Sequence, residues 1–408
     1  MKKIGIISLM MVIVLSSCIE KKPQLNAFNS SQDTLILETS KIKGEGLFST
    51  GAASLSLRDT TEYKKFLDWF DFQFVYPINL ENQKIGFTLI MMRPLKYYDK
   101  DNLDTIQVNT SREENTIGIV SGRIDEKEIF ILDENNNKDF RDDSIRTFKE
   151  WIWRSDANLI KCNYIVKKKD ETVRDSGWVK IGIWNGMILK TTCQHFEAIF
   201  SIDKKQYTLG VVDDNSSSFC YYSPKFALLG ENEIMRDTLL DRDILELGEY
   251  VKLGDSFYKI NKFYSGSGHI RLIRENDFKT KIGVQVGSIA PSFEFISNSG
   301  DTINSTVYEG KDYLITNVSG CSPRSYDVFK DICSSMDNAL EVIGVNSGIK
   351  DGLEGAIIDV ENNYNSDFYK YFRNAYSSYD CFLIGMDGRI KDRFSIFDWE
   401  SYLNEYIK

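Results

Sequence analysis

Histidine and long apolar runs are scarce in this sequence, and it has no net basic charge. Only two histidines, His195 and His269, occur in 408 residues, so histidine-dependent acid–base chemistry and metal binding are thinly supplied. The chain carries 50 Lys and Arg against 60 Asp and Glu, a formal net charge of −10, whereas nucleic-acid-binding proteins usually have a basic face. It also has no phosphate-binding glycine loop and no Ser-His-Asp signature. The composition therefore argues against nucleic acid as a partner and against nucleotide-dependent or serine-hydrolase chemistry.

The first 18 residues have the pattern of a secretory leader. Lys2 and Lys3 precede an apolar run, Ile4–Leu15, which is shorter than the ~20 residues that span a bilayer as a helix. The run ends in Leu15-Ser16-Ser17-Cys18, which resembles a bacterial lipobox. That resemblance implies a lipoprotein in which cleavage leaves Cys18 as an acylated N-terminus, with palmitate-type chains that anchor it to a membrane. A plain signal peptide with a chance cysteine is the alternative.

The rest of the chain is expected to be soluble and to lie in the cell envelope. Residues 19–31 are polar and lack periodicity, which favours a tether. No later segment is apolar enough to cross a membrane. We therefore expect a lipid-anchored protein that faces the periplasm or the cell surface.

Residues 32–280 have the sequence pattern of a β-rich region. Short runs rich in Ile, Val, Phe and Tyr, such as KEIFILDEN, WVKIGIW and QYTLGVV, are bounded by Asn, Asp, Gly or Ser, which are strand and turn signals. Strong helical periodicity is scarce. The pattern predicts a sandwich-like region of one or two modules.

Residues 284–408 differ, because strand-like runs alternate there with runs of helical spacing. KDYLITNVS, ALEVIGVN and CFLIGMDGRI read as strands, and SYDVFKDICSSM as a helix. This alternation predicts an α/β domain of ordinary size. The predicted fold class is thus multidomain α+β, with a β-rich N-terminal region and a C-terminal α/β domain.

The C-terminal segment also resembles a known group. Gly287, Ala290-Pro291 and Phe293 match a G-x-x-A-P-x-F opening, and Ser299–Phe329 follows with a buried strand and a cysteine at the start of a helix. Cys381–Phe394 matches a terminal hairpin. This order resembles the TlpA-like thiol–disulfide oxidoreductases of the envelope and the wider AhpC/TSA-type superfamily. The resemblance implies a thioredoxin-like fold and thiol-based redox activity.

The active-site pattern of that group is incomplete here. The group has Trp-Cys-x-x-Cys, but Gly320–Arg324 reads GCSPR, with glycine for the tryptophan and arginine for the second cysteine. The position that aligns with the cis-proline of the group holds Tyr379. A peroxidase is disfavoured, because the positions that align with the peroxide-activating groups of peroxiredoxins hold Leu314 and Val318.

What remains is a candidate single-thiol site at Cys321. A helix N-terminus and the nearby Arg324 both favour the thiolate, which would allow mixed disulfides or sulfenic acid. Cys333 lies ~18 Å along the same expected helix and is too distant to resolve a disulfide. Cys381 is the candidate resolving partner, with a buried, packed cysteine as the alternative. A vestigial Cys321 is the alternative to a reactive one.

A second candidate site is a run of alternating oxygen side chains. These are Asp133, Asn135, Asn137 and Asp139. Their spacing resembles a calcium loop, although Lys138 stands where the loop glycine is expected and Ser144 where the last glutamate is. The run predicts a structural calcium site, with an Asn/Asp-rich turn that needs no ion as the alternative. No other cofactor is expected.

The remaining cysteines and histidines suggest packing rather than chemistry. Cys193 and His195 would lie on one side of a strand, and two ligands fall short of a zinc site. Disulfides among Cys162, Cys193 and Cys220 are left open.

Two functions follow from these observations. The first is a thiol-based redox protein whose partners are envelope protein thiols or disulfides. The second is a non-catalytic envelope lipoprotein that binds a protein partner or a glycan.

Overall fold

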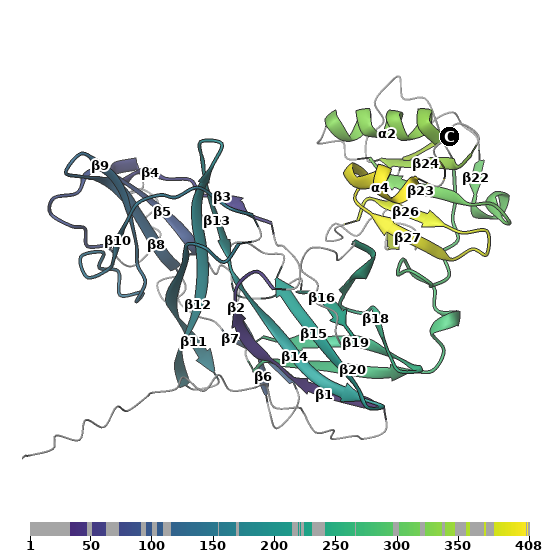
Figure 1. Cartoon of the computed structure of the whole chain (residues 1–408), viewed down its shortest axis with the longest axis horizontal. Coiled ribbons are helices and arrows are strands. Elements are labelled where there is room, and N and C mark those ends of the chain that lie inside the picture. Colours follow the sequence, from purple (N-terminus) through teal and green to yellow (C-terminus); the bar gives the residue numbers. More distant parts are fainter. Residues whose placement is uncertain are drawn as a thin grey trace, which may run out of the picture.

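The computed structural model is dominated by β-structure (Figure 1), which confirms the β-rich prediction. It describes residues 33–46, 51–62, 73–90, 95–99, 104–108, 116–153, 155–168, 171–213, 219, 221, 224–230, 241–265, 267–296, 302–318, 323–336, 339–346, 356–359, 371–372, 379–404 and 406. Within these residues, no helix is both long enough and apolar enough to cross a membrane.

Two sheets pack face to face to form a first sandwich. One sheet has the strand order β10-β9-β8-β5-β4 and the other has β11-β12-β13-β3. The strands are β3 (Ala53–Ser54), β4 (Arg58–Asp59), β5 (Glu81–Ile90), β8 (Thr116–Ile124), β9 (Lys127–Leu132), β10 (Ile145–Arg146), β11 (Leu159–Lys168), β12 (Glu171–Trp184) and β13 (Met187–Thr192). Alternate residues such as Ile117 and Ile119 of β8 and Val179 and Ile181 of β12 form the shared core, as period-two patterning requires.

A second sandwich is built in the same way. Its sheets have the orders β1-β20-β19-β18 and β17-β16-β15-β14-β2. The strands are β1 (Thr34–Glu38), β2 (Ser40–Lys43), β14 (Gln194–Ile202), β15 (Lys205–Asp213), β16 (Pro224–Leu229), β17 (Ile244–Glu246), β18 (Tyr250–Leu253), β19 (Ser256–Tyr264) and β20 (His269–Glu275). Leu35, Phe200, Leu209 and Leu272 lie in its core. A separate hairpin pairs β6 (Leu95–Asp99) with β7 (Asp104–Val108).

Three hairpins of these sandwiches close with two-residue turns. The turns are Asp125-Glu126, Asn185-Gly186 and Asp203-Lys204, and all six residues have positive φ. Two successive positive φ values define the type I′ turn, whose twist matches that of paired strands. Asn-Gly is the usual sequence for this turn, whereas the other two turns lack glycine and place a β-carbon-bearing residue in the left-handed backbone at both positions.

The C-terminal part is a mixed sheet with the order β25-β24-β23-β26-β27. Its strands are β23 (Tyr313–Asn317), β24 (Glu341–Asn346), β25 (Ala356–Asp359), β26 (Cys381–Ile384) and β27 (Ile390–Phe394). β23, β24 and β25 are parallel to one another, whereas β26 pairs antiparallel with both β23 and β27. A short hairpin of β21 (Glu294–Ile296) and β22 (Thr302–Asn304) precedes this sheet.

Helix α2 (Pro323–Met336) covers one face of this sheet. Tyr326, Phe329, Ile332 and Met336 follow helical spacing and are buried against Leu314 and Leu383 of the sheet. The short helix α4 (Trp399–Leu403) joins the same cluster. The opposite face packs against Phe293 and Phe295. Because the sheet is covered on both faces, successive residues of its central strand are buried: Leu314 packs in one layer and Ile315 in the other. Four 3₁₀ helices complete the described elements: η1 (Asp241–Asp243), η2 (Phe278–Thr280), η3 (Ser305–Tyr308) and η4 (Ile396–Asp398).

Candidate functional site

The link between β23 and α2 contains the predicted thiol. β23 is the central strand of the sheet, and the next described element along the chain is α2, whose first residue is Pro323. Proline suits this position because a first-turn N–H has no partner inside the helix. Cys321 falls in the intervening segment 319–322, which lies outside the described residues. Its reactivity therefore stays a prediction.

Arg324, the predicted tuning cation, lies in the first turn of α2. Its guanidinium stands over the ring of Phe397 at 5.2 Å from the centroid, a cation–π contact that holds the charge without neutralising it. Among the described residues, no carboxylate forms an ion pair with Arg324. Arg324 therefore places a cation in the first turn of the helix that follows Cys321.

Cys381, the predicted resolving partner, is fully buried at the start of β26. Its Sγ lies 3.1 Å from Thr316 Oγ1 on the neighbouring strand. Burial raises the pKa of this thiol well above its ordinary value, although the hydrogen bond with Thr316 opposes the rise. Cys333 is half-buried, and burial raises its pKa to about 11. Both environments disfavour the thiolate, and that of Cys381 fits the packed-cysteine alternative.

Tyr379, at the position aligned with the cis-proline, packs against the β-rich region. Its hydroxyl donates to the carbonyl of Ile244 at 2.5 Å, and its side chain is buried. The guanidinium of Arg393 stacks over the Tyr379 ring at 4.3 Å. The segment around β17 therefore packs against the C-terminal sheet where β26 begins and β27 ends.

Arg393 is the centre of that contact. It donates to both carboxylate oxygens of Glu249 and, at 2.6 Å, to the Ile244 carbonyl, with its side chain only 1% exposed. Burial lowers the pKa of Arg393, but the Glu249 carboxylate outweighs this and raises it overall. Next to it, Arg242 donates to Asp392 at 2.9 Å. Two ion pairs thus join the β-rich region to β27.

The oxygen-rich loop uses its side chains to cap its own backbone. Asn135 accepts from the N–H of Asn137, Asn137 from that of Asp139, and Asp139 from that of Arg141. Such successive turns place an Asx residue at every second position. The alternation that resembles a calcium loop is therefore also the alternation of serial Asx turns.

Lys138, which replaces the loop glycine, lies inside this loop. Its ammonium donates to the Thr116 carbonyl at 3.0 Å and to Asn136 Oδ1, and lies 3.8 Å from the fully buried carboxylate of Asp133. Burial raises the pKa of Asp133, while Lys138 and backbone N–H groups oppose the rise. No group of three or more Asp, Glu, His or Cys in the described residues is arranged to hold a metal. The calcium site stays a prediction, and an internal cation already faces Asp133.

The Cys193–His195 pair is packed away from solvent. His195 contacts the Gly44 carbonyl through Nδ1 at 3.0 Å and Glu197 through Nε2 at 3.1 Å. Both of its ring nitrogens therefore have partners. Cys162 and Cys193 are buried and are not joined in a disulfide, whereas Cys18 and Cys220 lie outside the described residues.

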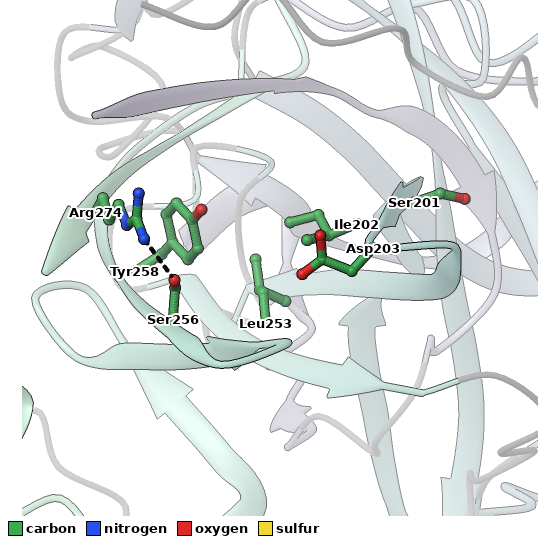
Figure 2. Close-up of a pocket in the computed structure, with 7 residues that line it drawn as sticks. All are labelled: Ser201, Ile202, Asp203, Leu253, Ser256, Tyr258 and Arg274. Carbon is green, nitrogen blue, oxygen red and sulfur yellow. Dashed lines mark hydrogen bonds between the residues drawn. The ribbon is translucent and has the colours of Figure 1, made fainter. Parts of the chain in front are cut away.

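Two cavities in the β-rich region were not foreseen from the sequence. One, of about 350 Å³, opens where β14–β15 and β18–β19 turn in the second sandwich. Figure 2 shows Arg274 and Asp203 on opposite sides of it, with Tyr258 and Leu253 between them and Arg274 donating to Ser256. The other, of about 690 Å³, opens at the end of the first sandwich. Both depend on strand pairings between distant segments, which local patterns do not fix.

The comparisons with known proteins concern only part of the chain. No family model and no curated protein matches it. Among solved structures, the thioredoxin domain of a thiol–disulfide oxidoreductase from Bacteroides vulgatus covers 30% of this chain and 98% of its own, at 13% identity and a TM-score of 0.26. A structure from Chlorobium tepidum, described as the thiol:disulfide interchange protein DsbE, covers 31% of this chain and 100% of its own, at 13% identity and a TM-score of 0.25. A C-terminal domain of a thiol–disulfide oxidoreductase from Bacteroides thetaiotaomicron covers 30% and 96%, at 18% identity and a TM-score of 0.25.

Proposed function

We propose that this protein is a lipid-anchored thiol protein of the bacterial envelope, whose C-terminal thioredoxin-like domain forms mixed disulfides through Cys321. The observation that carries the proposal is the connection from the central strand β23 through Cys321 to α2. The hairpin β26–β27 stands on the other side of β23. These are the elements, in the order, that the sequence resemblance implies.

The chemistry proposed for Cys321 needs no second cysteine. The thiolate attacks one sulfur of a partner disulfide, forms a mixed disulfide and releases the other sulfur as a thiolate. The positive end of α2 and the Arg324 cation, which has no carboxylate partner among the described residues, favour the thiolate over the thiol. A second partner thiol then displaces Cys321 and restores it. Cys381 is not required, in keeping with its full burial.

A non-catalytic role is the second candidate, and one observation favours it. Tyr379 and Arg393 are buried against Ile244 and Glu249, and Asp380, next to Tyr379, bonds Asn317 of β23, so the β-rich region contacts the sheet near the end of β23. A domain held in this way would present a fixed surface to a protein partner.

The pKa of Cys321 separates the two candidates. The rate of alkylation is measured against pH on the purified full chain in detergent, with Cys321→Ser identifying the reacting thiol. We expect a pKa below the ordinary ~8.5, raised towards that value by Arg324→Met. The control Lys330→Met, which removes an exposed cation farther along α2, should leave the pKa unchanged. A Cys321 pKa at or above ~8.5 in the wild-type chain would refute the redox proposal.

A further inference from the structure

The larger cavity of the β-rich region, here called the mouth cavity, opens between the two sheets of the first sandwich. Its volume is about 690 Å³, within the range of small-molecule sites. It is lined by Leu55, Leu57, Asp59, Asn82, Lys84, Ser121, Gly122, Arg123, Glu128, Ile129, Phe148, Gly186 and Ile188.

Strand register explains why a polar cavity forms at the end of this sandwich. Asp59 of β4 pairs with Lys84 of β5, Lys84 with Ser121 of β8, and Ser121 with Phe130 of β9. This row of residues lies on the same face of the sheet as Ile119, which belongs to the core. Ile119 and Ser121 are successive positions on the inward face of β8. Between them, this face changes from apolar to polar.

Ser121 is the polar residue deepest in this row. It is only 8% exposed, and among the described residues its hydroxyl has no hydrogen-bond partner. The Ser121 hydroxyl is not one of the fully buried polar atoms without a partner, so it is open to the cavity. A hydroxyl that lines a cavity and bonds no protein group can bind a ligand that enters the cavity.

The charges at the opening balance one another. Lys84 lies beside Asp59, whose pKa is lowered first by the hydrogen bond from the Thr61 side chain and to a smaller extent by Lys84. Arg123 pairs with Glu128 at 3.3 Å. Two cations and two anions leave no net charge to attract an ion. Alternating donors and acceptors instead match a ligand whose groups both donate and accept, as hydroxyls do.

The wall facing this polar row is apolar. Leu55, Leu57 and Ile188 line it together with Phe148, whose ring stacks on Phe130 at 4.7 Å. An aromatic ring beside aliphatic side chains suits the C–H face of a sugar ring, which is itself apolar. The polar row would then bind the hydroxyls at the ring edge.

We propose that the mouth cavity binds a neutral saccharide of one or two rings. Lys84 and Asp59 contact its hydroxyls, Ser121 binds the deepest one, and Phe148 packs against a ring face. This site is independent of the thiol chemistry proposed for Cys321, because it lies in a different part of the chain.

The test is saturation-transfer NMR on the purified full chain with four probes: maltose, cellobiose, lactose and N,N′-diacetylchitobiose. Hexanoate and hexylammonium serve as charged probes. The variants are Lys84→Met and Ser121→Val. Lys127→Met is the control, since Lys127 is exposed at the neighbouring turn and does not line the cavity. Thermal unfolding of each variant verifies its fold.

We expect at least one disaccharide to bind, with its affinity reduced about fivefold or more in Lys84→Met and Ser121→Val through the loss of one hydrogen bond each. Lys127→Met should bind as the wild type does. Three outcomes would overturn the proposal. These are no disaccharide binding at about 20 mM, well above a millimolar Kd, binding of a charged probe alone, and binding that the two cavity variants leave intact.

Discussion

The ion pair between Arg393 and Glu249 should be the strongest single contact between the β-rich region and the C-terminal sheet. The Arg393 side chain is 1% exposed and that of Glu249 14%, so neither charge is well solvated. Glu249→Gln keeps the shape of the side chain but removes its charge. The buried guanidinium would then keep the Ile244 carbonyl at 2.6 Å and the Tyr379 ring at 4.3 Å as partners, with only the weaker attraction of Glu246 opposing its charge.

Breaking a buried pair from one side costs about 3–5 kcal/mol. We take the lower end, about 3 kcal/mol, because the two remaining partners still stabilise the cation. Arg393→Met should cost less, since Glu249 is nearer to solvent. The double variant should cost less than the sum of the two, by a coupling energy of about 2 kcal/mol.

The assay is a double-mutant cycle in urea, followed by circular dichroism and by hydrogen exchange of residues 244–249 and 390–394. Exchange is needed because a chain with several cores need not unfold in one step. The matched control is Arg123–Glu128, whose side chains are 51% and 73% exposed, and whose coupling should be below about 1 kcal/mol. A coupling for Arg393–Glu249 no larger than that of the control would refute the reasoning.

Three further predictions concern the β-rich region. Lys138→Met should destabilise the protein by about 3 kcal/mol in urea denaturation, because the fully buried Asp133 loses its cation; a loss below 1 kcal/mol, on the scale of an exposed pair, would speak against an internal ion pair. Gly254→Ala should cost about 1–2 kcal/mol, because Gly254 has φ +60° and a Cβ there would lie 2.7 Å from Asp203 Oδ2. Adding Asp203→Ala to it should recover only the part due to the clash, and full recovery would exclude backbone strain. Burial raises the pKa of Asp143 to about 7, so its contribution to stability is full below the unfolded pKa near 4 and is lost as the pH rises through 7. Three pKa units correspond to about 4 kcal/mol, which partial exposure reduces to about 2 kcal/mol. Asp143→Asn should therefore match the wild type at pH 4 and exceed it at pH 8, and equal stability at both pH values would contradict this.

Local patterns predicted the strands and the amphipathic helix, because periodicity reports which face is buried. Ile117 and Ile119 of β8 and the apolar stripe of α2 are examples. Local patterns did not predict which charged residues are buried. Lys180 and Arg393 are each only 1% exposed. Lys180 is buried because it binds Glu45 and the carbonyls of Ile152 and Ser155.

Those partners are far away in the sequence, so no local rule identifies them. The mouth cavity was missed for the same reason. Its row of Asp59, Lys84 and Ser121 exists only through the pairing of β4, β5 and β8, and the β5–β8 register shifts twice at irregularities. The oxygen-rich loop shows a different difficulty. Its alternating Asp and Asn residues are visible in the sequence, but the same alternation fits both a calcium loop and a series of Asx turns.

The reaction of Cys321 with glutathione disulfide tests the central proposal most directly. The purified full chain is incubated with glutathione disulfide at neutral pH, and the product is read by intact mass and peptide mapping. The account predicts one glutathione adduct per chain, on Cys321, formed faster than on an ordinary thiol and absent in Cys321→Ser. The fully buried Cys162 and Cys381 should stay unmodified. No adduct on Cys321, or an adduct formed no faster than on the half-buried Cys333, would contradict it.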